Sequence, residues 1–304
     1  MPNPKATALS GIRGPNTALS YDRISAVLAG MSDVEIEALA ATAAGRKRGV
    51  GGHTGTVTVG GTPVFVKSVP VTGLELDHPG STANLFGLPM NYHYGIGSAG
   101  FGAWRELAVH TMTTGWVLDG TYPGFPVMYH SRVLPHEPPP VDVEHWAAHW
   151  HHDPAIRLRL EALAGAPAVV TLFLELLPYT MDLWLSDHPA PEWADAELRT
   201  GAGFLRSRGL LHLDAHFDNL LTDGHRVYFA DFGLALHEGF DLEADERAFL
   251  DRHRDYDVDY VRGHLNHWLT RHGLPGVAGN EEPARRTLAF WRRLESDRRA
   301  PYQA

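Results

Sequence analysis

Residues 211–219 read LHLDAHFDN, and residues 230–233 read ADFG. A strand–turn–strand pattern with a Thr-Asp-Gly turn joins the two segments. The pattern brings three oxygen-bearing side chains, Asp214, Asn219 and Asp231, to the ends of short strands. Hard cations such as Mg²⁺ take oxygen ligands and are often held by one or two carboxylates together with the phosphates of a substrate. A further aspartate can accept a proton from a hydroxyl group, so this spacing predicts a site for cation binding and proton transfer.

Upstream, the sequence predicts a glycine-rich loop followed by a β-hairpin. The loop spans residues 49–55 and contains Gly49, Gly51, Gly52 and Gly55. Alternating residues then predict a strand, Gly60-Gly61 predicts a two-residue turn, and Val-Phe-Val-Lys predicts a return strand that ends at Lys67. Lys67 is one of three lysines in a chain that otherwise uses arginine, so a compact charge on a flexible stem is favoured at this position.

In the order of these elements the chain resembles the protein-kinase-like superfamily. His212-x-Asp214-x-x-x-x-Asn219 is similar to the catalytic loop of that superfamily, and Asp231-Phe232-Gly233 is similar to its metal-binding motif. The resemblance covers residues 45–262. It implies an α+β, bilobal fold with a small antiparallel-sheet N-lobe, a mainly helical C-lobe and ATP between the two lobes.

The resemblance also implies roles for the residues of the two segments. Asp214 would be the catalytic base, and Asn219 and Asp231 would hold Mg²⁺. His216 would orient Asp214 or contact the transferred group.

A second set of residues would bind the nucleotide. Lys67 would hold the phosphates of ATP, and Glu106, in a helical pattern at 101–113, would be its ion-pair partner. Glu75 is the alternative partner. The resemblance places the other nucleotide contacts on the backbone of the glycine loop and of a hinge, Glu175–Pro178, at the end of the apolar run 168–177. The residues that would make these contacts are Gly49, Gly51, Gly52, Gly55, Glu175 and Leu177.

Several residues depart from the pattern of conventional protein kinases. Leu213 stands where those enzymes have an arginine that pairs with a phosphate on the activation loop, and no Ser or Thr occurs between Asp231 and Asp259. His216 stands where they carry lysine, as in the aminoglycoside, choline and related small-molecule kinases, although many of those lack the intact Asp-Phe-Gly. These differences favour ATP-dependent phosphorylation of a hydroxyl on a small molecule, such as an antibiotic, a nucleoside or a related metabolite.

Two other functions stay open at this point. The same catalytic residues would serve a Ser/Thr protein kinase, and a non-catalytic pseudokinase would use them to bind a nucleotide. The choice between ATP and GTP and the oligomeric state also stay open.

The resemblance divides the chain into three parts, which are an N-terminal extension with one short helix, an N-lobe and a C-lobe, at residues 1–44, 45–177 and 178–304. Gly, Pro, Ser and Thr are frequent in residues 1–30, which predicts loose packing there. Ser32 is a candidate N-cap for the short helix, with Glu35 three residues later. The segments 70–100 and 136–165 have no counterpart in the pattern and are interpreted as insertions that shape the acceptor site.

Composition excludes several classes of protein. The 304 residues include no cysteine, which excludes disulfide scaffolds, thiolate catalysis and cysteine-based zinc sites. The formal net charge of -10 argues against sequence-independent nucleic-acid binding. No apolar run approaches the ~18 residues that a membrane span requires, and the N-terminus has no signal-peptide pattern. We therefore expect a cytoplasmic protein with no nucleic-acid or membrane partner.

Charged and aromatic clusters give weaker indications. Residues 238–259 contain nine acidic side chains and three arginines, which could attract a cationic acceptor or form a solvated helix face. An uncharged or nucleoside-like acceptor stays possible. In the cluster His145–His152, two histidines four residues apart share a helix face and could bind zinc or nickel, although a surface insertion is the commoner context. Four aromatic residues could line an acceptor pocket or pack in the core, namely Tyr92, Tyr94, Trp146 and Trp150.

Overall fold

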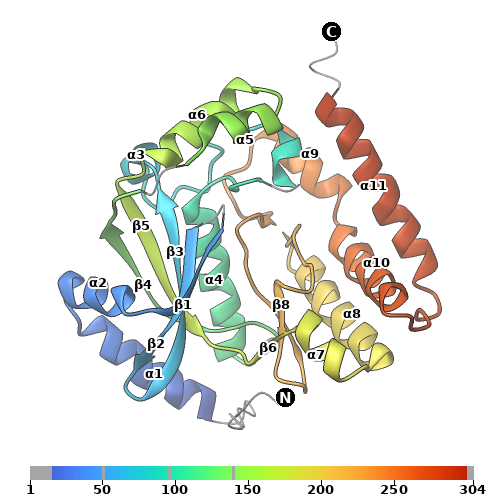
Figure 1. The fold of residues 1–304 in the computed structure, drawn as a ribbon, viewed down its shortest axis with the longest axis horizontal. Helices are drawn as coiled ribbons and strands as arrows, with labels where there is room; N and C mark the ends of the chain where they lie inside the picture. Colours follow the sequence, from blue (N-terminus) through green and yellow to red (C-terminus); the bar gives the residue numbers. More distant parts are fainter. Residues whose placement is uncertain (1–15, 50–51, 95–96, 139–140, 300–304) are drawn as a thin grey trace.

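The computed structural model describes residues 16–49, 52–94, 97–138 and 141–299 (Figure 1). The chain combines helices and sheets, as predicted, and its largest sheet has five antiparallel strands. This sheet lies on one side of the molecule, and the helices of the C-terminal part of the chain lie on the other (Figure 1).

The large sheet consists of two hairpin strands, one further internal strand and two edge strands. Its order is β1-β2-β3-β5-β4, with the bounds β1 Ala44–Gly49, β2 Gly52–Val59, β3 Thr62–Val71, β4 Met128–Pro135 and β5 Ala168–Glu175. Most of the apolar run at 168–177 forms β5, which lies between β3 and β4 and is buried along almost its whole length. Gly60 and Gly61 have φ angles of +53° and +80° and form the predicted turn between β2 and β3.

Two helices precede the sheet, α1 (Asn16–Ala29) and α2 (Asp33–Ala41). The short helix expected after Ser32 is confirmed as α2, whereas the loose packing expected for the preceding stretch is wrong for residues 16–29, which form α1. The helix α1 buries Ile24 and Leu28, one turn apart, against valines of β2. The capping box between Ser32 and Glu35 at the start of α2 is confirmed. Residues 1–15 lie outside the described residues.

The two predicted insertions pack against each other beside the N-terminus of the helix α4. Their elements are α3 Gly73–Asp77, the 3-10 turn η1 Met90–His93, α5 Val143–His149 and α6 Pro154–Ala164, and α4 spans Ala103–Leu118. Phe86 and Tyr92 of the first insertion share an apolar cluster with Trp150 and Leu160 of the second. The insertions therefore form one small core of their own.

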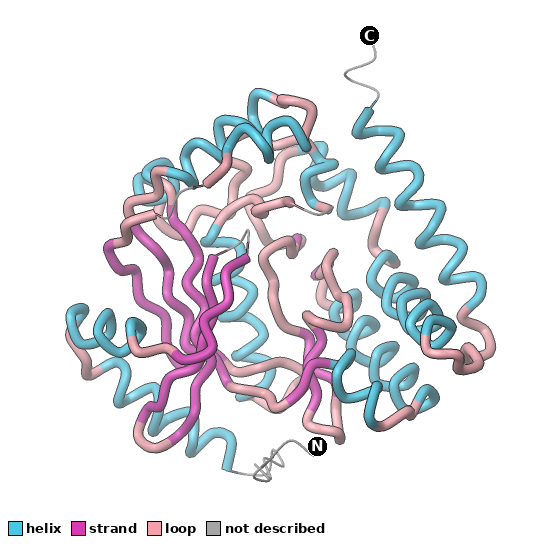
Figure 2. The backbone as a smooth tube through the Cα atoms, in the orientation of Figure 1, coloured by secondary structure: helices cyan, strands magenta, loops and turns pink. Residues whose placement is uncertain are grey.

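The C-terminal part is mainly helical and surrounds a second core (Figure 2). Its elements are β6 Tyr179–Thr180, α7 Met181–Asp187, α8 Pro191–Ser207, β7 Leu210–Leu211, β8 Leu220–Thr222, β9 Val227–Phe229, β10 Leu236–His237, α9 Ala244–Arg252, α10 Tyr256–Arg271 and α11 Glu281–Arg299. The strands β8 and β9 pair as the predicted strand–turn–strand. Within the described ranges, no helix has both the length and the apolar character that crossing a membrane would require.

Candidate active site

Lys67 lies at the centre of the polar contacts between the sheet and the C-terminal part. It is 7% exposed, and its Nζ lies 2.5 Å from Oε1 of Glu106 on α4 and 2.8 Å from Oδ1 of Asp231. The predicted ion pair between Lys67 and Glu106 is confirmed, whereas the alternative partner, Glu75, pairs with Arg159 at 2.8 Å. Burial opposes the charge of Lys67, but the two carboxylates outweigh it and raise the pKa of the ammonium group above its ordinary value.

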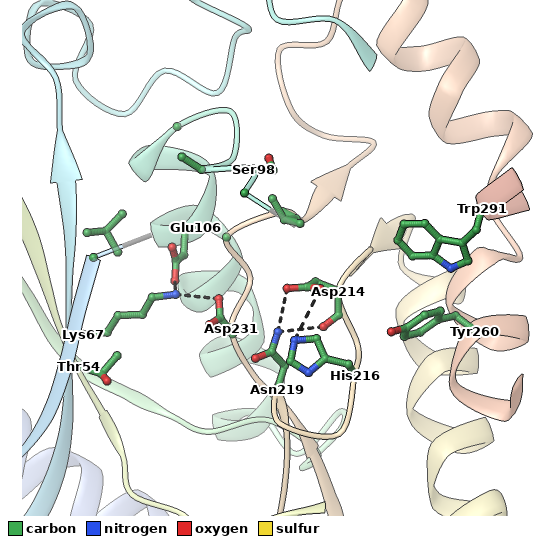
Figure 3. Close-up of a pocket in the computed structure, with 17 residues that line it drawn as sticks. Thr54, Lys67, Ser98, Glu106, Asp214, His216, Asn219, Asp231, Tyr260 and Trp291 are labelled. Carbon is green, nitrogen blue, oxygen red and sulfur yellow. Dashed lines mark hydrogen bonds and ion pairs between the residues drawn. The ribbon is translucent and has the colours of Figure 1, made fainter. Parts of the chain in front are cut away.

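Asp231 follows β9 and directs its carboxylate toward Lys67 (Figure 3). Its φ angle of +62° is left-handed, a conformation that costs energy for a residue with a side chain and is often found at functional sites. Burial works against its charge, but the ammonium of Lys67 prevails and lowers the pKa of Asp231 to about 2. The carboxylate therefore stays ionised at neutral pH, and it lines the pocket.

A buried carboxylate holds the segment that carries Asp214. Asp257 of α10 accepts hydrogen bonds from the backbone N–H groups of His212, at 2.6 Å, and Leu213, at 3.0 Å. Burial lowers the pKa of His212 to about 4, so its ring is neutral and donates from Nε2 to the carbonyl oxygen of Ala230 at 2.9 Å. These bonds fix the segment before Asp214 against the residue that precedes Asp231.

Asp214 and Asn219 are hydrogen-bonded within this loop (Figure 3). Nδ2 of Asn219 donates to Oδ2 of Asp214 at 2.9 Å and to its backbone oxygen at 3.0 Å. Burial raises the pKa of Asp214 to about 6, and the charge of Asp231 acts in the same direction. Nε2 of His216 lies 3.8 Å from Oδ1 of Asp214. Asp214 can therefore take up a proton close to neutral pH, as a general base must.

These side chains share one pocket with a volume of about 600 Å³. Lys67, Glu106 and Asp231 lie at one end of it, and Tyr260 of α10 and Trp291 of α11 lie at the other (Figure 3). The remaining lining residues are Gly52, Thr54, Val69, Gly97, Ser98, Ala99, Gly102, Asp214, His216, Asn219, Gly233 and Leu234. The pocket therefore has a charged end beside the sheet and an aromatic end beside the last two helices.

The glycines of residues 49–55 do not all reach this pocket. Gly52 lines it with a φ angle of +128°, and a Cβ there would lie 2.0 Å from the carbonyl oxygen of Ser68. Gly49 pairs with Gly52 at the end of β1. Gly55 lies outside the lining, and a Cβ there would lie 2.8 Å from the Cβ of Ala43. Gly51 lies outside the described residues.

The two hinge residues also lie apart from the lining of the pocket. Glu175 is the last residue of β5, where its N–H donates to the carbonyl oxygen of Val127 at 2.8 Å and its Oε2 accepts from the N–H of Val127 at 3.2 Å. Leu177 follows β5 and is half-buried. The structure does not bring either residue into the set that contacts Lys67, so a role of their backbone in binding a nucleotide stays a prediction.

Buried ion pairs fix α4, the helix that carries Glu106. Oε1 of Glu75 accepts a hydrogen bond from the N–H of Ala103, the first residue of α4, at 2.8 Å, and its Oε2 pairs with Arg159 of α6. On the opposite side, Arg105 of α4 pairs with Glu246 of α9 at 2.8 Å, and both side chains are almost fully buried. The insertions and the C-terminal part therefore hold α4 from two sides. Sequence patterns could not predict these pairs, because each pair joins distant segments.

The acidic residues of segment 238–259 do not line the pocket. Glu246 pairs with Arg105, and Asp257 accepts backbone hydrogen bonds. Asp259 pairs with Arg286 at 2.6 Å, and others pair with arginines at the surface, namely Glu238, Asp251 and Asp255. The expectation that this charge faces a cationic acceptor in the pocket is not met.

The histidines and aromatic residues singled out in the two insertions make packing contacts. The rings of His145 and His149 contact Trp146 edge-on. In the described ranges, no group of three or more His, Cys, Asp or Glu side chains is placed to hold a metal ion. Tyr92, Tyr94 and Trp150 are buried in the core, so packing is their observed use. Sequence reasoning missed Tyr260 and Trp291 instead, because aromatic residues on amphipathic helices read as core.

A scan against protein-family models finds no match to this chain, and a search of the curated proteins finds none either. Function is therefore inferred from the side chains of the pocket, together with the resemblance in the order of the motifs.

Proposed function

We propose that this chain transfers the γ-phosphoryl group of ATP to a hydroxyl group of a small molecule. One observation carries the proposal, namely that Nζ of Lys67 contacts both Glu106 and Asp231 in a pocket that Asp214 also lines. Lys67 and Asp231 are separated by 164 positions in the sequence, so this meeting depends on the fold and not on proximity along the chain. Positioning and electrostatic stabilisation, which phosphoryl transfer chiefly requires, are what such a cluster can supply.

A bilobal, kinase-like fold is part of the same proposal. The N-lobe would comprise residues 45–177, with the large sheet and α4, and the C-lobe would comprise residues 178–304. Support comes from the lining of the pocket, which draws Lys67 and Glu106 from the first part and Asp214, Asn219 and Asp231 from the second.

The polar end of the pocket fits Mg²⁺ and the phosphates of ATP. Both hydrogen bonds of the Asn219 side chain use Nδ2, and among the described residues no hydrogen bond engages its Oδ1. That oxygen and the ionised carboxylate of Asp231 are two oxygen ligands, a set that suits Mg²⁺ when phosphates and water complete its coordination. Mg²⁺, when bound, would neutralise charge on the phosphates. Lys67, fixed by Glu106, would bind phosphate oxygens as a point charge.

Asp214 would act as the base in the transfer. The acceptor oxygen forms a bond to the γ-phosphorus, the bond from that phosphorus to the β–γ bridging oxygen breaks, and ADP leaves. The hydroxyl proton passes to the carboxylate of Asp214, whose pKa of about 6 suits proton uptake near neutral pH. His216, 3.8 Å from that carboxylate, would orient it.

A small acceptor is favoured over a protein. Leu213 replaces the arginine that reads an activation-loop phosphate, and α4 is fixed by the buried pairs Glu75–Arg159 and Arg105–Glu246. Both pairs join Glu and Arg side chains, so a contact with a phosphate group is not needed to hold α4. The proposal therefore does not rely on the phosphorylation that orders many protein kinases.

The test is phosphoryl transfer by the purified chain with Mg²⁺-ATP and a panel of hydroxylated antibiotics, nucleosides and alcohols. The expected result is a product whose mass increases by one phosphoryl group, formed by the wild type and absent with Asp214→Asn. Calorimetry measures the binding of Mg²⁺-ATP to both proteins and shows whether Asp214→Asn is folded and still binds the nucleotide. A chain that binds no nucleotide, or that labels a protein substrate and no small molecule, would contradict the proposal.

A further inference from the structure

The aromatic end of the pocket has properties that select among acceptors. We infer that Tyr260 and Trp291 form a subsite for a neutral, planar, hydroxylated molecule such as a nucleoside or an aryl alcohol. The inference rests on the proposed function, because it names the class of molecule that receives the phosphoryl group.

Packing fixes both rings before any ligand binds. Tyr260 stacks on Tyr256 and His264, with centroid distances of 5.5 Å and interplanar angles of 19° and 28°. Trp291 makes an edge contact with buried Tyr94 at 6.1 Å and 62°. Both rings are half-buried and line the pocket. A planar ligand would therefore find a preformed aromatic surface, and binding would cost little side-chain ordering.

The charges of the lining are concentrated beside the sheet. Lys67 contacts both Glu106 and Asp231 there, and Asp214 is the single other carboxylate among the described lining residues. At the aromatic end, several ammonium groups of a polycation would therefore have to share Asp214 as their anionic partner, which is costly when they lose water. Lys67 is likewise the single lysine or arginine of the described lining, so an anionic acceptor lacks a partner beyond the phosphate end.

The two rings lie opposite the carboxylate of Asp214 (Figure 3), which is proposed to accept the hydroxyl proton. Tyr260 and Trp291 face Asp214 and His216 across the pocket (Figure 3). The negative charge of Asp214 reaches Tyr260, where it adds to burial in raising the pKa of the phenol. A planar molecule stacked on the two rings would present a hydroxyl substituent toward the carboxylate that accepts its proton.

The loop 97–99 forms another wall of the pocket and is also fixed. Oγ of Ser98 donates to the carbonyl oxygen of Tyr92 at 2.6 Å, and the N–H of Ala99 donates to the phenol oxygen of Tyr92 at 3.1 Å. Because Tyr92 is buried in the core formed by the two insertions, that core supports one wall of the acceptor subsite.

The first experiment measures binding without turnover. Calorimetry with a non-hydrolysable ATP analogue and Mg²⁺ compares three probes, which are a nucleoside, an aminoglycoside and a quaternary ammonium alcohol. The nucleoside is expected to bind with measurable heat, and the two cations are expected to bind at least tenfold more weakly. Tighter binding of either cation would overturn the inference.

The second experiment removes the rings. Trp291→Ala and Tyr260→Ala are each expected to raise the KM of the acceptor about tenfold, with the KM of ATP unchanged, since an aromatic contact contributes on this scale. Tyr260→Phe keeps the ring and is expected to raise the acceptor KM less than Tyr260→Ala does. The matched control is Leu288→Ala, an exposed position on the same helix that does not line the pocket. An unchanged acceptor KM in both alanine variants would overturn the inference.

The two experiments separate this inference from the proposed function. Transfer to an aminoglycoside alone, unaffected by Trp291→Ala, would leave phosphoryl transfer standing and overturn the aromatic subsite. Binding of the nucleoside that depends on both rings, without any transfer from Mg²⁺-ATP, would keep the subsite and contradict the proposed reaction.

Discussion

Asp231 and Asp214 line the same pocket, but the pKa values of their carboxyl groups are shifted in opposite directions. Burial opposes ionisation of both. At Asp231 the contact with Lys67 outweighs burial and brings the pKa to about 2, whereas at Asp214 burial prevails and brings it to about 6. The difference teaches that one cation, placed on one side of the pocket, separates a permanent anion from a proton acceptor. Pairs of titratable groups with separated pKa values mark acid and base roles in enzymes.

The two ends of the pocket also differ in the kind of contact from which they are built. The sheet end is built from ion pairs, because Lys67 brings together Glu106 and Asp231. The helical end is built from stacked rings, at Tyr260 and Trp291. Such a division suits a reaction in which a highly charged donor meets a neutral acceptor.

The largest expected effect comes from removing the proton acceptor. Asp214→Asn keeps the size of the side chain but cannot take up the proton, so kcat should fall by about 10²–10⁴-fold. The affinity for Mg²⁺-ATP, set at the sheet end, should change little. Steady-state rates together with calorimetry check both statements. A variant that retains wild-type turnover would show that the contrast between the two aspartates has no catalytic meaning.

The next effect concerns the buried pairs that hold the sheet end in place. Arg159→Met would leave Glu75 buried without its partner, which should reduce the free energy of unfolding by about 3–5 kcal/mol. Adding Glu75→Gln should recover part of this loss, because no uncompensated charge then remains. Arg157→Met, on the same helix but in an exposed pair with Glu144, is the matched control and should change stability little. Urea unfolding measures all four proteins, and equal effects of the two arginine substitutions would contradict the assignment.

Local patterns predicted the parts of the site that depend on short segments. The return strand that carries Lys67 was predicted from strand periodicity and turn residues, which act locally, although β3 continues beyond Lys67 to Val71. The spacing of Asp214, Asn219 and Asp231 is likewise a local pattern. The ion pair of Lys67 with Glu106 followed from the resemblance and is confirmed. In the same way, a capping box needs only four residues, and the one at Ser32 is present.

The parts that could not be predicted depend on contacts between distant segments. Glu75 and Arg159 are 84 positions apart, and no periodicity links them. Tyr260 and Trp291 have the spacing of core residues on their helices, so only the assembled fold shows that they line a pocket. The error at α1 is different, because Ile24 and Leu28 are one helical turn apart and carry a signal that the surrounding Gly and Pro residues obscured.

A smaller effect is expected in the pH dependence of turnover. Since Asp214 must be ionised to accept a proton and its pKa is about 6, kcat/KM for the acceptor should be constant above that pH and fall about tenfold for each unit below it. Burial also raises the pKa of Asp257 to about 6, so this residue needs a control. Asp257→Asn should retain the acidic limb of the profile. Loss of that limb in Asp257→Asn would transfer the titration from Asp214 to Asp257.

The smallest expected effect is on stability. Asp214→Asn, which should lower the activity, should raise the melting temperature. A carboxyl group whose pKa is higher in the folded chain than in the unfolded chain binds its proton more tightly when folded, so stability falls as pH rises from the ordinary pKa toward the folded value of about 6. Asp214→Asn removes this penalty and should melt at a higher temperature than the wild type above pH 6, with the difference vanishing near pH 4. Asp218→Asn, in the same loop but 75% exposed, is the control and should show no such pH-dependent gain. If the Asp214→Asn variant melts lower than the wild type at pH 8 and equally at pH 4, Asp214 is stabilised by its surroundings, and the contrast with Asp231 is lost.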